Sequence, residues 1–416
     1  MSGKKHATAM AVSNGVVLLC HLGILALLTR TIPLETVGAY GLLMALTQPA
    51  YMLLLLGLRG NLAADATRRI DFRDALALRG LMAGLFCIGG CGSVALWRPE
   101  LLSVAAPLLL LKTVEMLGDL LFGAAQRAGD IPFVARGWAL RGGVGLCGFG
   151  TGVAAFGSLD GALWVQVLCV SAAIALHDLP ILQKLEVGLR PRWRKTAIHG
   201  LLAGSAPLGL SQCFIALQMA LPRLIMGAVL GPVAVALYLP AAYLERAAVT
   251  GMNSFDQALG WRLARHWAAG ERRAFSWLLA RMFGFAAGVG AAGTLLIILG
   301  GGALVDAVFG KGYADTAALL LWIMPATALR LCANVLQSGI VAQRRFRMLG
   351  WLQGVLFTAS LPAMWLGVTF GGLIGIAQAI TLLALLRLAV LSGIFATAFA
   401  GQKGKVLPAK AVQSVG

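Results

Sequence analysis

The sequence predicts an all-α polytopic membrane protein, and its composition, segment lengths and loop charges all lead to that class. Of the 416 residues, 59% are hydrophobic and 12% are charged, and the mean hydropathy is +0.85. Soluble domains carry about 25% charged residues, so this chain has too few to cover a water-facing surface. Its apolar residues form runs of about 20, the length of a helix that crosses the hydrocarbon core of a bilayer.

Twelve such runs follow one another, separated by short basic patches. The first run, after Lys4 and Lys5, is too long for the core of a signal peptide, and no small-residue cleavage site follows it. We therefore interpret it as a retained first span. The segments SLDG (158–161) and TFGG (369–372) predict tight turns between antiparallel neighbours. The predicted spans are 7–29, 37–57, 76–96, 101–124, 137–157, 161–181, 200–222, 233–254, 276–300, 315–340, 348–369 and 373–398.

Lysine and arginine predict the orientation of these spans. Alternate connections, counted from the N-terminus, hold 26 of the 34 basic residues, whereas the opposite side holds Arg30, Arg98, Arg223 and Lys311. Basic loops are retained on the cytoplasmic side, so we expect both termini to be cytoplasmic. The net charge of +18 then follows from topology, and we expect no nucleic-acid partner.

The chain also predicts two halves. The basic segment 185–199 divides the spans six and six, and Arg30 and Arg223 close the first helix of each half. Two parallel six-span halves are a common transporter architecture. We therefore expect an N-terminal six-helix lobe (1–184), a cytoplasmic linker (185–199), a C-terminal six-helix lobe (200–400) and a cytoplasmic tail (401–416), with the lobes around a central cavity.

Polar residues inside the spans carry the main functional signal. They recur at helical spacing, and in a bilayer such residues face a bundle interior or a wet cavity. Four cations against three anions near mid-span predict a cationic cavity for an anionic guest, with the alternative that the charges only pair and hold helices together. The charged residues are Lys112, Glu115, Asp119, Glu245, Arg246, Arg330 and Arg387, and the polar ones are Asn14, His21, Asn253, Asn334 and Gln337.

No enzymatic or metal motif competes with this signal. The chain contains no H-E-x-x-H or G-x-S-x-G pattern. The G-x-G-x-x-G spacing at Gly143, Gly145 and Gly148 lies inside a predicted span without a preceding strand, which favours helix packing over dinucleotide binding. We expect no catalysis, no metal and no cofactor.

An ordered series of segments resembles a known family. LLTRTIPLETVGAYGLL (27–43) is followed by a span, an LGLRG turn and a basic loop. The second half has VLGPVAVALYLPAAYLERA (229–247), then FGKGY (309–313), and a basic loop after NVLQSGIVAQ (334–343). Over about residues 7–398, this series resembles the polysaccharide and O-antigen flippases of the multidrug/oligosaccharidyl-lipid/polysaccharide exporter (MOP) superfamily.

The resemblance implies export of a lipid-diphosphate-linked oligosaccharide from the cytoplasmic to the periplasmic leaflet of the bacterial inner membrane, by alternating access, for surface polysaccharide synthesis. It implies that cavity cations hold the diphosphate or acidic sugars. We carry over Arg30, with Arg223 as its second-half counterpart, as the periplasmic mouth. The segment between spans seven and eight lacks the acidic residue often found there, which leaves ion coupling in doubt.

From the stripes we add Lys112, Arg246, Arg330 and Arg387 as substrate-binding residues, and Glu115 and Asp119 as candidates for a proton or sodium step. Expected partners are the lipid-linked oligosaccharide, membrane lipid and polysaccharide polymerase or chain-length components. The alternatives are a small-molecule efflux pump of the same superfamily, a membrane glycosyl polymerase or ligase, and a scaffold subunit of an export complex. A polymerase or ligase would need a larger periplasmic loop than this chain has.

Overall fold

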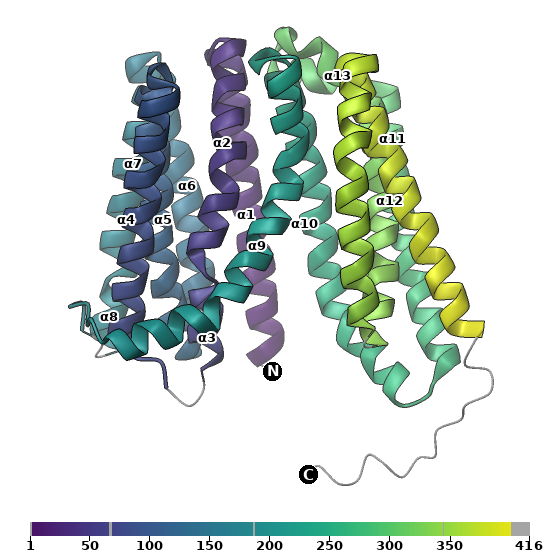
Figure 1. Ribbon diagram of the computed structural model, residues 1–416, viewed down its shortest axis with the longest axis horizontal. Coiled ribbons are helices and arrows are strands. Elements are labelled where there is room, and N and C mark those ends of the chain that lie inside the picture. The colour runs from purple at the N-terminus through teal and green to yellow at the C-terminus, as the bar shows by residue number, and fades with distance from the viewer. Residues whose placement is uncertain (1, 66–68, 186–187, 344, 401–416) are drawn as a thin grey trace. The chain divides into compact units, whose positions relative to one another are not determined.

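The computed structural model describes residues 2–65, 69–185, 188–343 and 345–400, and over these residues the chain is helical, with no strand. Of residues 2–5, 7, 253–255, 257–258, 346–347, 350 and 396–400 it describes the backbone alone. Figure 1 shows long helices joined by short connections. The predicted all-α class is confirmed.

Eleven helical segments of the described chain are long and apolar enough to cross a membrane. The last, Trp351–Phe395, has 45 residues, about twice what one crossing needs. Within it Gly372 leaves helical geometry (φ 54°, ψ −136°). A Cβ added at Gly375 would overlap the carbonyl oxygen of Gly367, so the two arms fold back closely on each other. The chain reverses at the predicted TFGG turn, and the predicted twelve spans are present.

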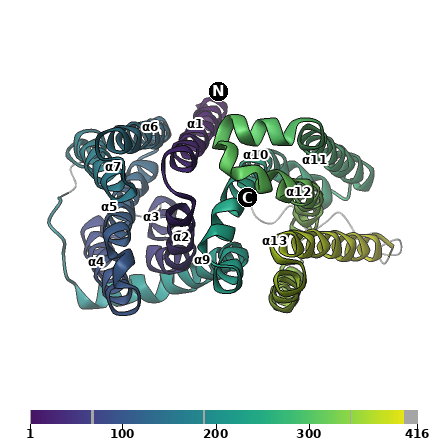
Figure 2. The ribbon, with the colours of Figure 1, turned by 90° about the horizontal axis from the view of Figure 1, so that it is seen from above.

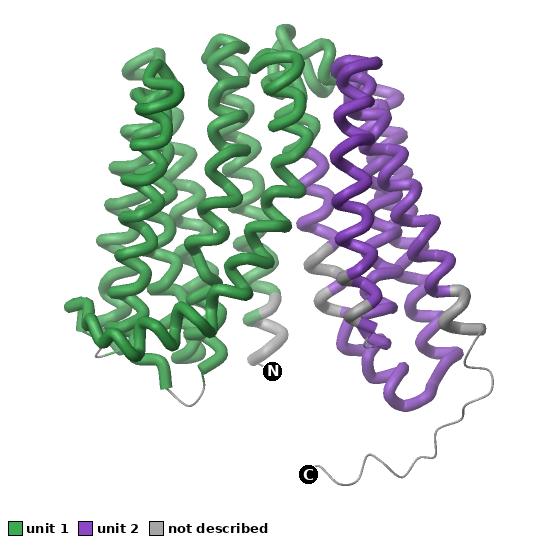
Figure 3. The backbone as a smooth tube through the Cα atoms, viewed as in Figure 1, with its two compact units in different colours: residues 1–243, 302–316 green, residues 244–301, 317–416 purple. Residues whose placement is uncertain are grey.

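Two compact units divide the chain (Figure 3): unit 1 is Met1–Tyr243 with Gly302–Thr316, and unit 2 is Leu244–Gly301 with Ala317–Gly416. Their bounds differ from the predicted lobes 1–184 and 200–400, because α9 (Lys195–Val229) packs against α2 (Leu34–Leu55) within unit 1. The division into six-helix lobes stays a prediction.

Unit 1 is a helical bundle built around α5. This helix contacts α3, α4 and α7, while α6 lies between α1 and α7, as the view from above shows (Figure 2). Leu56 and Gly57, both in left-handed conformation, separate α2 from α3. The remaining elements are α1 (Ser2–Thr31), α3 (Leu58–Ala64), α4 (Phe72–Trp97), η1 (Pro99–Leu101), α5 (Leu102–Arg127), α6 (Ile131–Phe156), α7 (Leu159–Ala173), the π-helical η2 (Ile174–Asp178) and α8 (Pro180–Lys184).

Local sequence signals set where these helices begin. Asp71 caps α4 by accepting a hydrogen bond from the Arg73 amide (3.0 Å), and Ser158 caps α7. Asp130 caps α6, which has Pro132 in its first turn, the position at which proline fits a helix best. The start of α6 at Ile131 lies six residues before the predicted span 137–157, so the helix takes in Arg136 as well as Arg141.

The predicted linker is fastened to unit 1. Arg194 donates to Asp74 (Nε to Oδ2, 3.0 Å), and Arg192 lies 3.8 Å from Asp71. Asp74 is buried, and its contact with Arg194 raises the pKa of that guanidinium. These contacts tie the described part of the segment, 188–194, to the start of α4.

Unit 2 is built from the later helices, of which α10 to α12 also extend into unit 1. Its apolar core includes Met252 on α10, Phe275 and Leu279 on α11, and Leu331 and Ile340 on α12. Gly290 packs directly on Ala328, so α11 and α12 approach closely, as small residues allow in membranes. The elements are α10 (Pro232–Ala268), α11 (Arg272–Phe309), η3 (Lys311–Tyr313), α12 (Ala314–Ala342) and α13 (Phe346–Ala400).

Candidate functional site

Eight of the twelve polar residues predicted inside the spans belong to one of two clusters, one cluster in each unit. We call them the unit 1 cluster and the unit 2 cluster. The unit 1 cluster comprises Arg59, Arg79, Lys112, Glu115, Asp119, Arg141 and Asp178, and the unit 2 cluster comprises Glu245, Arg330, Asn334, Gln337, Gln353 and Arg387.

Lys112 and Glu115 form an ion pair on one face of α5. The Lys112 Nζ donates to Glu115 Oε2 over 2.7 Å, and both side chains are partly exposed (19% and 32%). The residues are three apart, a spacing that places side chains on the same side of a helix. Lys112 therefore already has a carboxylate partner, which agrees with the pairing alternative for this residue.

Asp119, one turn further along α5, lies between two arginines. It accepts a hydrogen bond from Arg59 Nη1 on α3 (3.1 Å), and Arg79 Nη2 on α4 lies 4.0 Å from its other oxygen. Arg79 is fully buried, and none of its three guanidinium nitrogens has a hydrogen-bond partner in the described chain. A buried guanidinium is costly without a nearby anion, so Asp119 is the residue that makes Arg79 tolerable.

Arg141 completes the unit 1 cluster from α6. Its Nε donates to Asp178 Oδ2 (2.7 Å) and its Nη2 donates to the Gly118 carbonyl (3.0 Å). Asp178 ends the π-helical turn and is 1% exposed. A Cβ at position 118 would overlap the Arg141 guanidinium. Glycine at 118 is therefore what allows this ion pair to form against α5.

The count of basic residues in the cytoplasmic connections included Arg59, Arg79 and Arg141, although the predicted spans 76–96 and 137–157 contain the last two. They lie in α3, α4 and α6, and each faces the interior of unit 1. The predicted spans thus already placed Arg79 and Arg141 in helices. Asp71, which caps α4, and Asp130, followed by Pro132 at the start of α6, mark helix starts that lie earlier still.

In unit 2 one cation has a carboxylate and another has none. Arg330 on α12 donates to Glu245 on α10. Arg387 on α13 donates to the side-chain oxygens of Asn334 (3.1 Å) and Gln337 (2.7 Å), and Gln353 donates to the same Gln337 oxygen (3.3 Å). No described carboxylate lies within 4.0 Å of Arg387, and its Nε is buried without a partner in the described chain. Neutral amides orient this guanidinium but leave its charge uncompensated.

Arg246 follows Glu245 but points elsewhere. It is exposed, and no hydrogen bond or ion pair joins it to another described residue. Within the described residues 244–252, 282–301, 317–342 and 351–395 of unit 2, the cations are Arg246, Arg330 and Arg387, against the single carboxylate of Glu245. The predicted cation excess persists in this unit.

Arg30 has a structural partner. Its Nε donates to the Val308 carbonyl (3.0 Å) and its Nη2 to the Ala307 carbonyl, both in the last turn of α11. Carbonyls at a helix C-terminus lack partners within the helix and carry partial negative charge. Arg30 therefore fastens the end of α1 to the end of α11 within unit 1, a contact that the sequence did not reveal.

The other predicted residues are more dispersed. On α1, Asn14 is half-buried and His21 is exposed. Arg223 is half-buried on α9. Asn253 lies outside the residues whose side chains the structure describes.

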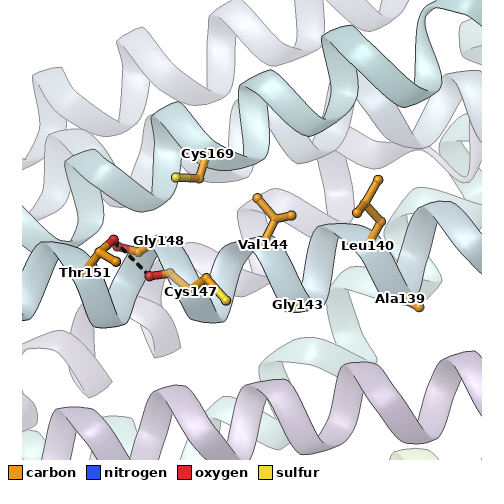
Figure 4. Close-up of a pocket in the computed structure, with 8 residues that line it drawn as sticks. All are labelled: Ala139, Leu140, Gly143, Val144, Cys147, Gly148, Thr151 and Cys169. Atoms are coloured by element: carbon orange, nitrogen blue, oxygen red, sulfur yellow. Dashed lines mark hydrogen bonds between the residues drawn. The ribbon is translucent and has the colours of Figure 1, made fainter.

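An apolar pocket of about 450 Å³ opens along α6 (Figure 4). A Cβ added at Gly148 would lie 2.9 Å from the Cβ of Cys169 on α7, so this glycine allows close helix packing, as predicted. A Cβ added at Gly143 would have no described atom within 4 Å. The pocket carries no charged group. Its lining residues are Ala139, Leu140, Gly143, Val144, Cys147, Gly148, Thr151 and Cys169.

Comparison with known proteins identifies the fold. No family model and no curated protein sequence matches the chain. Among solved structures, an inward-facing multidrug resistance MATE family transporter of the MOP superfamily matches with a TM-score of 0.69 and 14% identity, over 93% of this chain and 96% of that one.

An outward-facing MATE family transporter of the same superfamily matches with a TM-score of 0.58 and 13% identity, over 95% and 94% of the two chains. A mutant of the Vibrio cholerae MATE transporter VcmN matches with a TM-score of 0.56 and 14% identity, over 96% of each chain. At such identity the likeness shows the fold alone. The chain is a multi-pass membrane protein with the MATE fold, while membership of the MOP superfamily and of its polysaccharide flippase family stays a prediction.

Proposed function

We propose that the protein is an exporter that works by alternating access and whose cargo is anionic, namely a lipid-diphosphate-linked oligosaccharide. The observation that carries the proposal is Arg387, a partly buried guanidinium held only by the amide oxygens of Asn334 and Gln337. An uncompensated cation in a membrane span is costly, and a diphosphate supplies the missing charge with paired oxygens that suit a guanidinium.

The surroundings of Arg387 support this assignment. Arg330 lies within electrostatic range of Arg387, so two like charges share this region while Glu245 neutralises only one of them. Arg246 adds a third cation on α10. In this proposal Arg387 and Arg246 attract the anion, and Arg330 is released from Glu245 as the anion approaches.

Alternating access is supported by the fold, because matching transporters have been solved in inward-facing and outward-facing conformations. Coupling to a proton or to sodium through Glu115 or Asp119 remains part of the proposal. Both carboxylates already have basic partners, so a coupling ion would compete with Lys112 or Arg59. Polysaccharide polymerase and chain-length components are the protein partners that this function predicts, with localisation in the bacterial inner membrane and both termini in the cytoplasm.

The test uses Arg387→Gln and Arg246→Gln in a bacterial strain whose own flippase is deleted and whose surface glycan depends on this chain. We expect each variant to reach wild-type abundance in the membrane, to lower surface polysaccharide at least tenfold, and to accumulate lipid-linked intermediates in the inner leaflet. The matched control is Arg98→Gln, which removes an exposed arginine paired with Glu100 outside the clusters. Normal glycan export by both Arg387→Gln and Arg246→Gln would refute the proposed cargo site.

A second candidate is efflux of small molecules. It is favoured by the fold, because two of the matching structures are multidrug resistance transporters. Expression in a drug-sensitive strain distinguishes the two functions. Export of a lipid-linked oligosaccharide predicts no protection against cationic dyes, because the unit 2 cluster repels cations. Resistance to such dyes with no effect on surface glycan would establish efflux instead.

A further inference from the structure

The connection between α10 and α11 forms a basic helical hairpin, residues 261–281. Helix α10 continues beyond the predicted span 233–254 to Ala268, and α11 begins at Arg272. From Met282 to Val305 the sequence has no charged residue. The helix is unbroken from Met282 to the non-helical Gly300, and residues 282–299 extend about 27 Å, close to the thickness of the hydrocarbon core. Arg281 therefore marks the membrane boundary, and the rest of the hairpin lies beyond it.

Most of the charge on this hairpin is uncompensated. It carries five arginines, Arg262, Arg265, Arg272, Arg273 and Arg281, and one acidic residue. That residue, Glu271, is bound to His266 (2.5 Å). Within the described chain, Arg262, Arg265, Arg273 and Arg281 have no carboxylate within 4.0 Å. The basic segment of unit 1 differs, because Arg192 and Arg194 there lie against Asp71 and Asp74.

Tryptophans support these arginines. Arg262 and Arg265 lie over the ring of Trp261 (5.4 and 5.5 Å to its centroid), and Arg281 lies over Trp277 (4.5 Å). Trp261 and Trp277 are 56% and 60% exposed. Tryptophan is enriched where a protein crosses the membrane–water interface, and a cation held over an aromatic face is attracted to it. The hairpin thus combines rings suited to the interface with cations held beside them.

We propose that this hairpin binds the headgroups of anionic phospholipids in the adjoining leaflet, predicted to be the cytoplasmic one. The orientation rule explains why arginines occur on this side of the membrane, but not why four of them lack an acidic partner while three of those four lie over exposed tryptophans. A phosphate-bearing lipid supplies the missing anion at the depth of Arg281. The inference is independent of the cargo, because it rests on residues outside both clusters.

The test compares full-length protein in nanodiscs of phosphatidylcholine alone and of phosphatidylcholine with phosphatidylglycerol. We expect phosphatidylglycerol to raise the melting temperature of the wild type and to be retained in native mass spectra in preference to phosphatidylcholine. In the variant with Arg262, Arg265, Arg273 and Arg281 changed to glutamine, preferential retention should fall about tenfold or more, and the gain in melting temperature should disappear. A variant with Trp261→Leu and Trp277→Leu should lose part of both.

The matched control changes Arg69, Arg136, Arg190 and Arg192, exposed basic residues of unit 1, to glutamine, which removes the same charge. It should retain phosphatidylglycerol as the wild type does. Equal losses in both quadruple variants would overturn the proposal, since net charge would then suffice, and so would an absence of preference in the wild type. A gain in melting temperature from inorganic phosphate alone, in phosphatidylcholine nanodiscs, would replace the lipid with a free anion. If the hairpin variant does not fold, the wild type is measured at high salt instead. Its preference for phosphatidylglycerol should then fall, because salt weakens electrostatic binding, and an unchanged preference would overturn the proposal.

Discussion

The two units differ in how the charged side chains inside their membrane spans are neutralised. In unit 1, Arg59 and Lys112 contact the carboxylates of Asp119 and Glu115, and Arg141 contacts buried Asp178. In unit 2, Arg330 is paired with Glu245, whereas the partners of Arg387 within the described residues are amide oxygens. Carboxylate pairs fix helices in place and leave little affinity for an added anion, whereas amides orient a guanidinium without neutralising it. The comparison indicates that unit 1 uses its charges mainly for structure and unit 2 keeps charge available for a ligand.

The largest effect should come from removing the shared carboxylate of unit 1. Asp119→Asn leaves Arg59 and fully buried Arg79 without an anion, and breaking a buried pair in this way costs about 3–5 kcal/mol. We expect a strongly reduced melting temperature and low yield in detergent. Adding Arg79→Met should restore much of the stability, because the unpaired charge is removed as well. An Asp119→Asn variant as stable as the wild type would break the comparison between the units.

A smaller loss of stability should follow from adding one methyl group at position 118. Gly118→Ala places a Cβ where the Arg141 guanidinium lies, so the contacts of Arg141 with Asp178 and with the Gly118 carbonyl must shift. We expect a loss of about 2 kcal/mol, read as a lower melting temperature. Gly143→Ala is the control, because nothing described lies within 4 Å of its added Cβ. Alanine favours a helix over glycine, so the control should be neutral or gain up to about 1 kcal/mol.

The sequence predicts more of the fold than of the candidate site. The spans followed from run length, and even the TFGG turn at Gly372 was predicted, because crossing a bilayer constrains length so strongly. The face that joins Lys112, Glu115 and Asp119 followed from helical spacing. Partners across helices did not, since Glu245 and Arg330 are 85 positions apart and no local pattern links them. Arg79 and Arg141 lay inside predicted spans but were counted with the cytoplasmic connections, because a basic residue near a span's end is typical of a loop.

Double-mutant cycles would sharpen the comparison pair by pair. The Glu245–Arg330 pair joins α10 to α12, with Glu245 largely buried, so we expect a coupling energy of about 1–3 kcal/mol on thermal unfolding. The Lys112–Glu115 pair lies along a single helix, and its coupling should be about 0.5 kcal/mol or less. The same cycles read on export separate structure from transport. If Lys112 and Glu115 are coupled in stability but not in export, Lys112 serves to pair with Glu115. If they are coupled in export but not in stability, Lys112 belongs to the cargo site.

The smallest effect concerns a carboxyl group of unit 2 beyond the membrane span. Asp256 is 9% exposed, and its Oδ1 has no partner in the described chain. Burial raises its pKa from 3.8 to about 6. Because the folded state holds this proton more tightly than the unfolded state, its stabilising contribution is complete below pH 3.8 and is lost as the pH rises through 6. Asp256→Asn cannot ionise, so it should raise the melting temperature by a few degrees at pH 7.5 and flatten its change between pH 4 and 6. Melting curves of the variant and the wild type that stay parallel from pH 4 to 7.5 would show that Asp256 is paired, and the contrast between paired and unpaired charge would then be confined to the membrane spans.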